Sequence, residues 1–378
     1  MATRPRRTVI ITLSERCNLH CTYCYEKGKN TSTMPLEMAK GIVEREFSEA
    51  IGYDELFFEF HGGEIALAFN RLKEVLEWMW RTDFGKPFKC FSMTNGTLIH
   101  GEIADWFEKN RERITLGFSL DGTPEIHNRN RTNSYSQIDF AYFLRNWPKQ
   151  PVKMTFSPET VPHLAECLKH AHGLGFEVRA NLAYGIPWPE ELLPAYGAQL
   201  TEMVAWYLEN PEILPASLFT SRLERIGQIA VGGPRPLKWC SCGDNGVCYA
   251  PDGKRYPCQV FMPSSLGYDA SEELARLDYK DVAGFHDVGC DGCPLEPSCA
   301  NCPAHNYKIS GNLATRQRDI CAYRKVEILH AATMMGKMLQ APEKYRAIRE
   351  LAAEDVPFVA RGVLEVMEYF GKGGELQP

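Results

Sequence analysis

The distribution of cysteine along the chain is the feature that most restricts how it can fold. Fourteen of the 378 residues are cysteine, and eleven of these fall between residues 17 and 24 or between residues 242 and 321. The apolar stretch near the N-terminus is too short for a signal peptide, so we expect a cytoplasmic protein whose thiols stay reduced. The clustered cysteines therefore predict metal ligands rather than disulfides.

The overall composition and charge are ordinary for a globular protein. Hydrophobic residues make up 44% of the chain and charged residues 24%, and the formal net charge is −6. Because no long run of Lys or Arg is present, we expect neither a nucleic acid nor an anionic membrane surface as a partner. No apolar segment reaches the length of a membrane span.

Strand-like and helix-like segments alternate from about residue 8 to about residue 209. Six apolar or β-branched runs are the expected strands, at residues 8–13, 55–60, 88–93, 114–120, 152–156 and 176–184. The segments between them carry apolar side chains at helical spacing. This repetition predicts an α/β fold with a parallel sheet, a partial TIM-like (β/α)6 barrel.

Composition divides the chain into three predicted regions. The barrel is expected over residues 8–232, because periodicity stops there and the Cys, Gly and Pro content rises. Residues 233–325 suggest little regular structure and would need metal to hold a fold. Helical periodicity returns over residues 326–378, which we interpret as a C-terminal helical cap and tail.

The first cysteine group lies in the loop after the first predicted strand, which is the catalytic end of a parallel barrel. It reads C-x3-C-x2-C and supplies Cys17, Cys21 and Cys24. Three thiolates on a [4Fe–4S] cluster leave one iron open to an outside ligand. The alternative is that these three cysteines belong to a zinc knuckle, although no fourth cysteine lies nearby in the sequence and the spacing of His20 is unusual for zinc.

This spacing, with an aromatic residue before the last cysteine, resembles the cluster motif of the radical S-adenosylmethionine (SAM) superfamily. The resemblance implies that the open iron binds the methionine part of SAM and that reductive cleavage gives a 5′-deoxyadenosyl radical. It also implies that Tyr23 packs against the adenine.

Further segments resemble the SAM-binding positions of that superfamily. His61 is followed by a Gly-Gly-Glu element, and other matching residues end the third and fourth strands or follow them. By resemblance, Gly62, Gly63 and Glu64 receive the methionine ammonium, and Ser119 and Arg131 bind its carboxylate. Thr94 and Asn95 complete the expected cofactor-binding set. An arginine fork suits a carboxylate.

The second cysteine-rich segment resembles the SPASM extension of the superfamily. By that resemblance, two further [4Fe–4S] clusters are bound, one by Cys242, Cys248, Cys258 and Cys302 and one by Cys290, Cys293, Cys299 and Cys321. Two four-thiolate zinc sites would also fit the spacings alone. Fully ligated clusters can pass electrons but cannot readily bind substrate, so electron transfer is the expected role of this pair.

Two positions bear on the reaction. Enzymes that form formylglycine in sulfatases resemble this chain but carry an Asp as base where it has Gln259, and a Gln where it has His61. We therefore interpret His61 and Gln259 as the substrate-facing positions and expect a thioether or carbon–carbon cross-link in a ribosomally made peptide. Epimerisation would need a thiol donor, for which the spare cysteines are Cys90, Cys167 and Cys240, and sulfatase maturation remains an alternative.

The expected partners follow from this chemistry. They are a precursor peptide and an electron donor such as flavodoxin or ferredoxin. Only seven residues precede the first predicted strand, so a separate protein could supply leader-peptide binding. A zinc-stapled scaffold protein is the alternative from a different class.

Overall fold

The computed structural model describes residues 6–234, 239–280 and 283–372. It divides into two compact units. The first unit comprises residues 1–120, 127–150 and 240–281, and the second comprises residues 121–126, 151–239 and 282–378. Each unit therefore combines part of the predicted barrel with part of the cysteine-rich segment. The boundaries at residues 232 and 325 stay a prediction.

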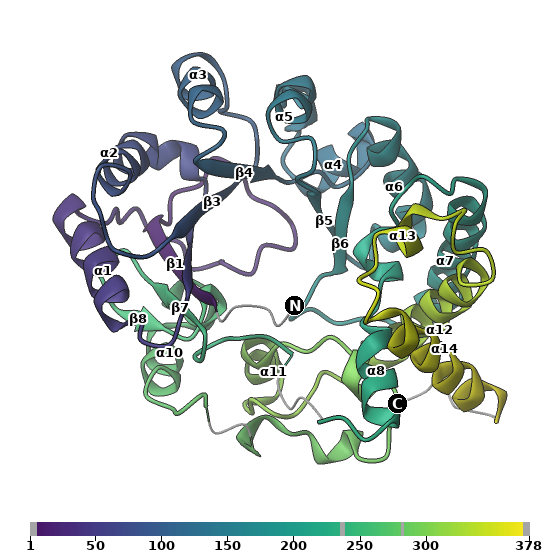
Figure 1. Ribbon diagram of the computed structural model, residues 1–378. Helices are drawn as coiled ribbons and strands as arrows, with labels where there is room; N and C mark the ends of the chain where they lie inside the picture. The colour runs from purple at the N-terminus through teal and green to yellow at the C-terminus, as the bar shows by residue number, and fades with distance from the viewer. Residues whose placement is uncertain (1–5, 235–238, 281–282, 373–378) are drawn as a thin grey trace. The chain divides into compact units, whose positions relative to one another are not determined.

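A six-stranded sheet forms the centre of the first unit (Figure 1). Its order is β4-β3-β2-β1-β7-β8, and only the β7–β8 pair is antiparallel. The strands are β1 (Arg6–Ser14), β2 (Glu55–Gly62), β3 (Phe88–Thr94), β4 (Ile114–Phe118), β7 (Gly246–Tyr249) and β8 (Arg255–Tyr256). The four parallel strands predicted here are confirmed, and their carboxyl ends meet at one edge of the sheet.

The burial of their side chains explains these strands and the helices that cover them. In β1, the consecutive residues Val9, Ile10 and Ile11 are all buried, as expected of a strand covered on both faces. The apolar stripe of α1 buries Ile42 and Val43. The α-helices of this unit are α1 (Leu36–Glu49), α2 (Phe69–Met79), α3 (Gly101–Lys109), α5 (Phe140–Asn146), α9 (Pro263–Leu266) and α10 (Tyr268–Leu274).

The β7–β8 hairpin differs from the sequence expectation of little regular structure after residue 240. β7 extends the sheet by pairing with β1, Ile10 opposite Cys248. A buried polar cluster secures this pairing. Glu46 on α1 accepts hydrogen bonds from Arg7 Nε at 2.9 Å and from the Tyr249 hydroxyl at 2.5 Å. Because this pairing joins residues far apart in the chain, local patterns could not reveal it.

The second unit contains β5 (Val152–Phe156) and β6 (Val178–Leu182), which form a parallel two-stranded sheet. Both strands were predicted. Its α-helices are α6 (Leu164–Gly173), α7 (Leu193–Glu209), α8 (Leu223–Ala230), α11 (Pro303–Ser310), α12 (Cys321–Met338), α13 (Arg346–Arg349) and α14 (Val356–Gly371). Helix α12 packs on α7 and α14, so the predicted C-terminal helices are confirmed. Helix α4 (Pro124–Asn130) contains the boundary between the two units.

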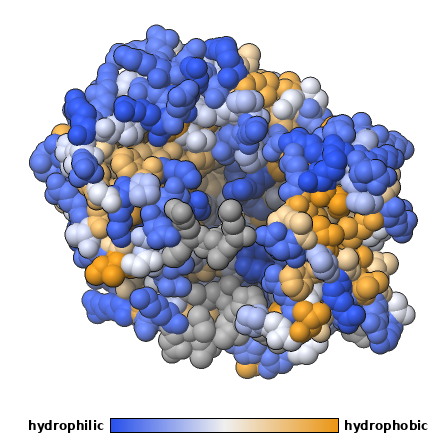
Figure 2. All heavy atoms as spheres, in the orientation of Figure 1, coloured by the Kyte–Doolittle hydropathy of each residue, from blue (hydrophilic) through white to orange (hydrophobic). Residues whose placement is uncertain are grey.

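The helices and one face of the surface can be compared with what a membrane segment requires. Within residues 6–234, 239–280 and 283–372, no helix is both long and apolar enough to cross a bilayer. Hydrophilic side chains cover most of the face in Figure 2, with separate hydrophobic areas among them. Single exposed apolar residues such as Ile51 and Val288 are usual for a folded protein.

Candidate functional site

The loop after β1 carries the first three cysteines, all half-buried. The end of α4 and the residues that follow it hold this loop in place. The amide of Thr22 donates to the Asn130 carbonyl at 3.0 Å, and the amide of His20 donates to the Thr132 hydroxyl at 3.0 Å. Thr132 has a φ of 55°, which is unusual for a β-branched residue. The loop is thus supported by residues that sequence analysis missed.

Gly62 and Gly63 end β2 where it meets this loop. The amide of Gly63 donates to the Ser14 carbonyl at 3.1 Å, and that of Glu64 donates to the Arg16 carbonyl at 2.7 Å. A Cβ on Gly63 would lie 2.5 Å from the Arg16 carbonyl oxygen, and one on Gly62 would lie 2.6 Å from that of Ser14. The glycines therefore let two backbone segments of this chain pack together. The sequence had predicted contact of these glycines with a ligand, and it had not predicted this packing.

Replacing Gly63 by alanine should destabilise the protein by about 1–3 kcal/mol, because backbone atoms cannot move aside as a flexible side chain can. Thermal unfolding measures this as a lower midpoint. Gly41→Ala on α1 is the matched control, since its Cβ would have no atom within 4 Å and alanine favours a helix. Equal midpoints for Gly63→Ala and the unmodified protein would show that the close approach is not required.

Glu64 is buried and fixes the carboxyl end of β3. Its carboxylate accepts hydrogen bonds from the Thr94 hydroxyl at 2.6 Å, the Asn95 amide at 2.7 Å and the Ala66 amide at 3.0 Å. Burial raises the pKa of Glu64, while these bonds and the charge of Arg131 oppose the rise. A carboxylate has about four acceptor positions, so one remains for a ligand cation.

Asn95 also connects the ends of β1 and β3. Its side-chain amide donates to Asn18 Oδ1 at 2.8 Å, and the Asn18 side-chain amide donates to the Thr97 hydroxyl at 2.9 Å. Asn18 lies between two of the predicted cluster ligands. The expected cofactor residue Asn95 therefore also orients the cysteine loop, and no motif or spacing pointed to Asn18 or Thr97.

Arg131 is buried and lies beside the cysteine loop. Its Nη1 is 4.0 Å from Cys21 Sγ, and its guanidinium carbon is 5.5 Å from the centre of the Tyr23 ring. The predicted Ser119 follows β4, where its amide donates to the Thr94 carbonyl at 3.2 Å. Cys21, Tyr23, Glu64 and Arg131 thus gather at the carboxyl edge of the sheet.

His61 forms a partly buried ion pair that sequence analysis did not anticipate. Its Nε2 lies 3.1 Å from Glu26 Oε1 and 3.5 Å from the Tyr25 hydroxyl, and Lys29 Nζ is 3.7 Å from Glu26 Oε2. Burial lowers the pKa of His61, but the hydrogen bond and charge of Glu26 outweigh it, so the pKa is raised. Conversely, burial raises the pKa of Glu26, and His61 and Lys29 outweigh it, so that pKa is lowered. Each group of the pair therefore favours the charged form of the other.

Three cysteines of the second group lie in the first unit. Cys248 is buried on β7, and Cys258 precedes Gln259, which begins the 3-10 helix η6 (Gln259–Phe261). The amide of Gly243, next to Cys242, donates to the carbonyl of Pro257, next to Cys258, at 2.9 Å. Tyr279 also lies near both of these cysteines, since burial and their charges raise its pKa. Cys302, the fourth ligand of this predicted set, is half-buried in the second unit.

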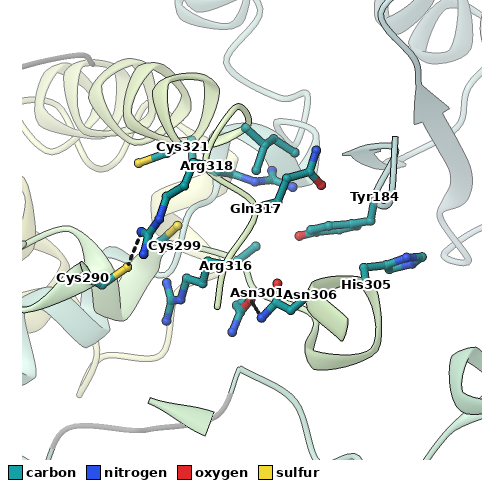
Figure 3. Close-up of a pocket in the computed structure, with 13 residues that line it drawn as sticks. Tyr184, Cys290, Cys299, Asn301, His305, Asn306, Arg316, Gln317, Arg318 and Cys321 are labelled. Atoms are coloured by element: carbon teal, nitrogen blue, oxygen red, sulfur yellow. Dashed lines mark hydrogen bonds between the residues drawn. The ribbon is translucent and has the colours of Figure 1, made fainter. Parts of the chain in front are cut away.

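The other predicted four-cysteine set lies wholly in the second unit. Cys290, Cys299 and Cys321 line one pocket (Figure 3). The amide of Cys293 donates to the Cys290 carbonyl at 3.2 Å, which places the fourth member next to them. Within the described part of the chain, no three His, Cys, Asp or Glu side chains converge as ligands of a single metal ion.

Comparisons with known proteins identify the family. Residues 11–146 match the model of the radical SAM superfamily. A cysteine-type anaerobic sulfatase-maturating enzyme of Clostridium novyi is 32% identical over 326 residues, covering 76% of this chain and 84% of that protein. The chain belongs to the radical SAM superfamily. The subtilosin biosynthesis protein AlbA of Bacillus subtilis is 31% identical over 348 residues, which cover 84% of this chain and 71% of AlbA.

A solved structure supports the fold of this radical SAM enzyme. Histidine-tagged anSMEcpe with bound AdoMet superposes with a TM-score of 0.70 at 18% identity, over 94% of this chain and 98% of that one. The predicted α/β partial barrel with a cysteine-rich C-terminal region is therefore confirmed, as is the predicted enzyme class.

The residues at the carboxyl edge fit the cofactors of this superfamily, an iron–sulfur cluster and SAM. Lys29 lies near Cys17 and Cys24, and Arg131 lies near Cys21. Positive groups beside thiols favour the thiolate form that ligates iron. When bound, the cluster and SAM supply a 5′-deoxyadenosyl radical. The polypeptide holds the thiols, offers Glu64 to a cation and places the His61–Glu26 pair on the same unit.

Proposed function

We propose that this radical SAM enzyme modifies a residue of a ribosomally made peptide and forms an intramolecular thioether or carbon–carbon cross-link. The observation that carries the proposal is the site at the edge of β1–β4, where a three-cysteine loop lies beside Glu64 and Arg131. The similarity to AlbA, a bacteriocin biosynthesis protein, supports a peptide substrate. Recognition of the precursor peptide, with or without a separate leader-binding protein, belongs to the same proposal.

The assignment of cofactor contacts is part of this proposal. Cys17, Cys21 and Cys24 would hold the cluster that cleaves SAM. Tyr23 would pack on adenine, Gly62 to Glu64 would receive the ammonium, and Ser119 and Arg131 would bind the carboxylate. Thr94 and Asn95 would complete the cofactor-binding set. Arg131 lies beside both Cys21 and Tyr23, which supports one shared ligand for these residues.

Two auxiliary [4Fe–4S] clusters complete the proposed set of three. One would use Cys242, Cys248, Cys258 and Cys302, and the other would use Cys290, Cys293, Cys299 and Cys321. Forming a cross-link removes two hydrogens and so requires an outlet for an electron. Closed clusters suit that task, with a flavodoxin or ferredoxin as the external partner.

The spare cysteines favour cross-linking over epimerisation, which would need an accessible thiol. Cys90 on β3 and Cys167 on α6 are both buried. Burial raises the pKa of each thiol to about 12, as expected for residues of an apolar core. Cys240 alone among the three spare cysteines is exposed. Two of the three donors on which epimerisation could depend are therefore packed inside the protein.

Sulfatase maturation is the second candidate, because the Clostridium novyi relative carries that name. Gln259 opposes it. An amide is not a useful proton acceptor, and formylglycine formation requires a base at the position after the Tyr-Pro-Cys element. A sulfatase-derived peptide would test this candidate, since a formylglycine product carries an aldehyde that hydrazide reagents capture.

Mass spectrometry of the reacted precursor peptide tests the proposed reaction. Cross-linking should lower the peptide mass by two hydrogens, and fragmentation should fail between the joined residues. The substrate is sought among short open reading frames next to the gene. Unchanged mass with uptake of one deuterium from heavy water would instead establish epimerisation, and an aldehyde product would establish sulfatase maturation.

A further inference from the structure

The pocket in the second unit combines thiols with guanidinium groups (Figure 3). Three cysteines and three arginines are among its lining residues: Cys290, Cys299, Cys321, Arg316, Arg318 and Arg324. The arginines come from two places, the loop before α12 and the first turns of α12 itself. Sequence analysis assigned the cysteines but gave no role to these arginines.

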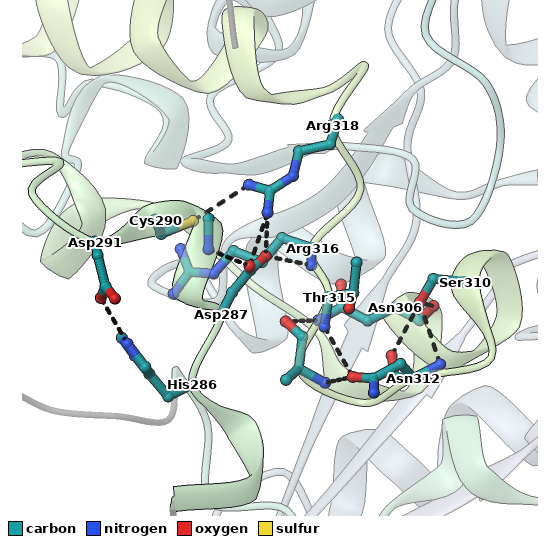
Figure 4. Close-up of polar contacts among 12 residues, drawn as sticks. His286, Asp287, Cys290, Asp291, Asn306, Ser310, Asn312, Thr315, Arg316 and Arg318 are labelled. Atoms are coloured by element: carbon teal, nitrogen blue, oxygen red, sulfur yellow. Dashed lines mark hydrogen bonds and ion pairs between the residues drawn. The ribbon is translucent and has the colours of Figure 1, made fainter.

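Arg318 reaches directly to a predicted cluster ligand (Figure 4). Its Nη1 is 3.5 Å from Cys290 Sγ, while its Nη2 donates to both carboxylate oxygens of Asp287 at 2.7 and 2.8 Å. Gly289 leaves room for this arrangement, since a Cβ there would lie 2.2 Å from Arg318 Nη2. Asp287 thus holds the guanidinium over the backbone next to Cys290, with one nitrogen directed at sulfur.

Arg316 and Arg324 also pair with carboxylates. Arg316 pairs with Glu296, and Arg324 Nη1 donates to Glu327 Oε2 at 2.6 Å. Nε and Nη1 of Arg316, like Nε and Nη2 of Arg324, are buried without a hydrogen-bond partner among the described residues. Both arginines line the same pocket as the Cys299 thiol.

Buried guanidinium nitrogens that lack partners indicate an anionic occupant, because buried polar groups are almost always hydrogen-bonded. The pocket is lined by thiols that could ligate iron, and a four-thiolate [4Fe–4S] cluster is an anion whose sulfides and thiolates accept hydrogen bonds. A carboxylate partner fixes each arginine, and all three arginines line the same pocket as the thiols. The arginines and cysteines thus fit one and the same group.

We propose that Arg316, Arg318 and Arg324 form a cationic shell that raises the reduction potential of the auxiliary cluster bound by Cys290, Cys293, Cys299 and Cys321. The inference rests on the ligand assignment in the proposed function and adds a role for this chain's own arginines. Reduction adds one negative charge to the cluster, so nearby positive charge and N–H donors stabilise the reduced form more than the oxidised form. Arginine keeps its charge at all working pH values.

The shell gives this cluster a specific place in the proposed reaction. A cluster with a raised potential accepts an electron readily, which is what the product side of cross-linking requires. These three arginines would therefore act as positioning and tuning residues that never touch the substrate. The effect of these arginines is therefore measured as a change in the reduction potential of the cluster, not as a change in the reaction rate.

Redox titration followed by electron paramagnetic resonance tests the proposal. The full chain is used with Cys17, Cys21 and Cys24 replaced by alanine, so that signals come from the auxiliary clusters alone. In that background, Arg316→Gln with Arg318→Gln should lower the reduced-to-oxidised ratio at a fixed potential at least tenfold, a shift of about 59 mV for one electron. Arg318→Lys, which keeps the charge but loses the fork, should give a smaller shift.

Arg361→Gln is the matched control, because Arg361 pairs with Glu365 within α14 and its charge loss should leave the potential unchanged. The single variant Arg318→Gln controls for failure of the double variant to fold or to load its clusters. The Arg318 side chain is 42% exposed, so its removal leaves no buried cavity. An unchanged potential in iron-loaded variants would overturn the cationic shell. If the background protein itself loads only one auxiliary cluster, the ligand assignment fails instead, so the two failures are distinguishable.

Discussion

Replacing Cys17, Cys21 and Cys24 together by alanine is expected to abolish the formation of 5′-deoxyadenosine. These three thiols lie in one loop at the carboxyl end of β1, beside Arg131 and Lys29. No other described cysteine occupies that loop, so the variant would have no ligands for the cluster that cleaves SAM. Chromatography of reactions containing SAM and dithionite, after anaerobic reconstitution, measures the product.

Two measurements separate this effect from misfolding. The triple variant should retain about two thirds of the iron of the unmodified protein, because the auxiliary clusters use other cysteines. Cys240→Ala is the matched control, since this exposed cysteine belongs to none of the three proposed clusters, and it should leave SAM cleavage unchanged. Continued production of 5′-deoxyadenosine by the iron-loaded triple variant would refute the role of the loop.

The strands show which parts of the fold local sequence could predict. All six predicted strands are present. Each run, such as residues 8–13 or 152–156, consists largely of apolar or β-branched side chains, and this composition by itself predicts a buried strand. The β7–β8 hairpin was missed. Its position depends on Glu46, which meets Arg7 and Tyr249 from distant parts of the chain, and such a contact leaves no periodic signal.

The residues of the candidate site likewise include some that the sequence predicted and some that it did not. Cys17, Glu64 and Arg131 were predicted because their motifs have a characteristic spacing. Asn18 and Thr132 support the same loop through single hydrogen bonds and belong to no spacing pattern. A residue that supports a functional residue through a hydrogen bond is recognised only once the structure shows the two residues in contact.

Gly63 illustrates a third case, in which the residue was predicted and its surroundings were not. Sequence analysis expected the glycines to admit a ligand, whereas the structure places the carbonyls of Glu15 and Arg16 where a Cβ would stand. A Gly-Gly pair shows that some atom comes close to the backbone, but the sequence cannot say which atom. The packing of β2 against the cysteine loop supplies that answer.

Replacing His61 by alanine should reduce formation of the cross-linked peptide by about 10²- to 10⁴-fold, the usual range for loss of a general acid or base. His61 lies in β2 directly before the Gly-Gly-Glu element, and Glu26 holds its imidazole at 3.1 Å. The hydrogen bonds that hold the Glu64 carboxylate come instead from Thr94, Asn95 and Ala66. SAM cleavage should therefore continue without product, so that 5′-deoxyadenosine accumulates uncoupled from peptide modification.

Glu26→Gln should give a smaller loss, because it keeps a hydrogen-bonding partner for the imidazole but removes the charge that orients it. The surface pair of His163 and Glu166, 2.6 Å apart on the second unit, offers a matched control. His163→Ala should leave both products unchanged. If His61→Ala forms cross-linked peptide at the unmodified rate, the ion pair is structural, and the proton must be accepted elsewhere. If His61→Ala instead stops SAM cleavage, His61 supports the cofactor site rather than the substrate.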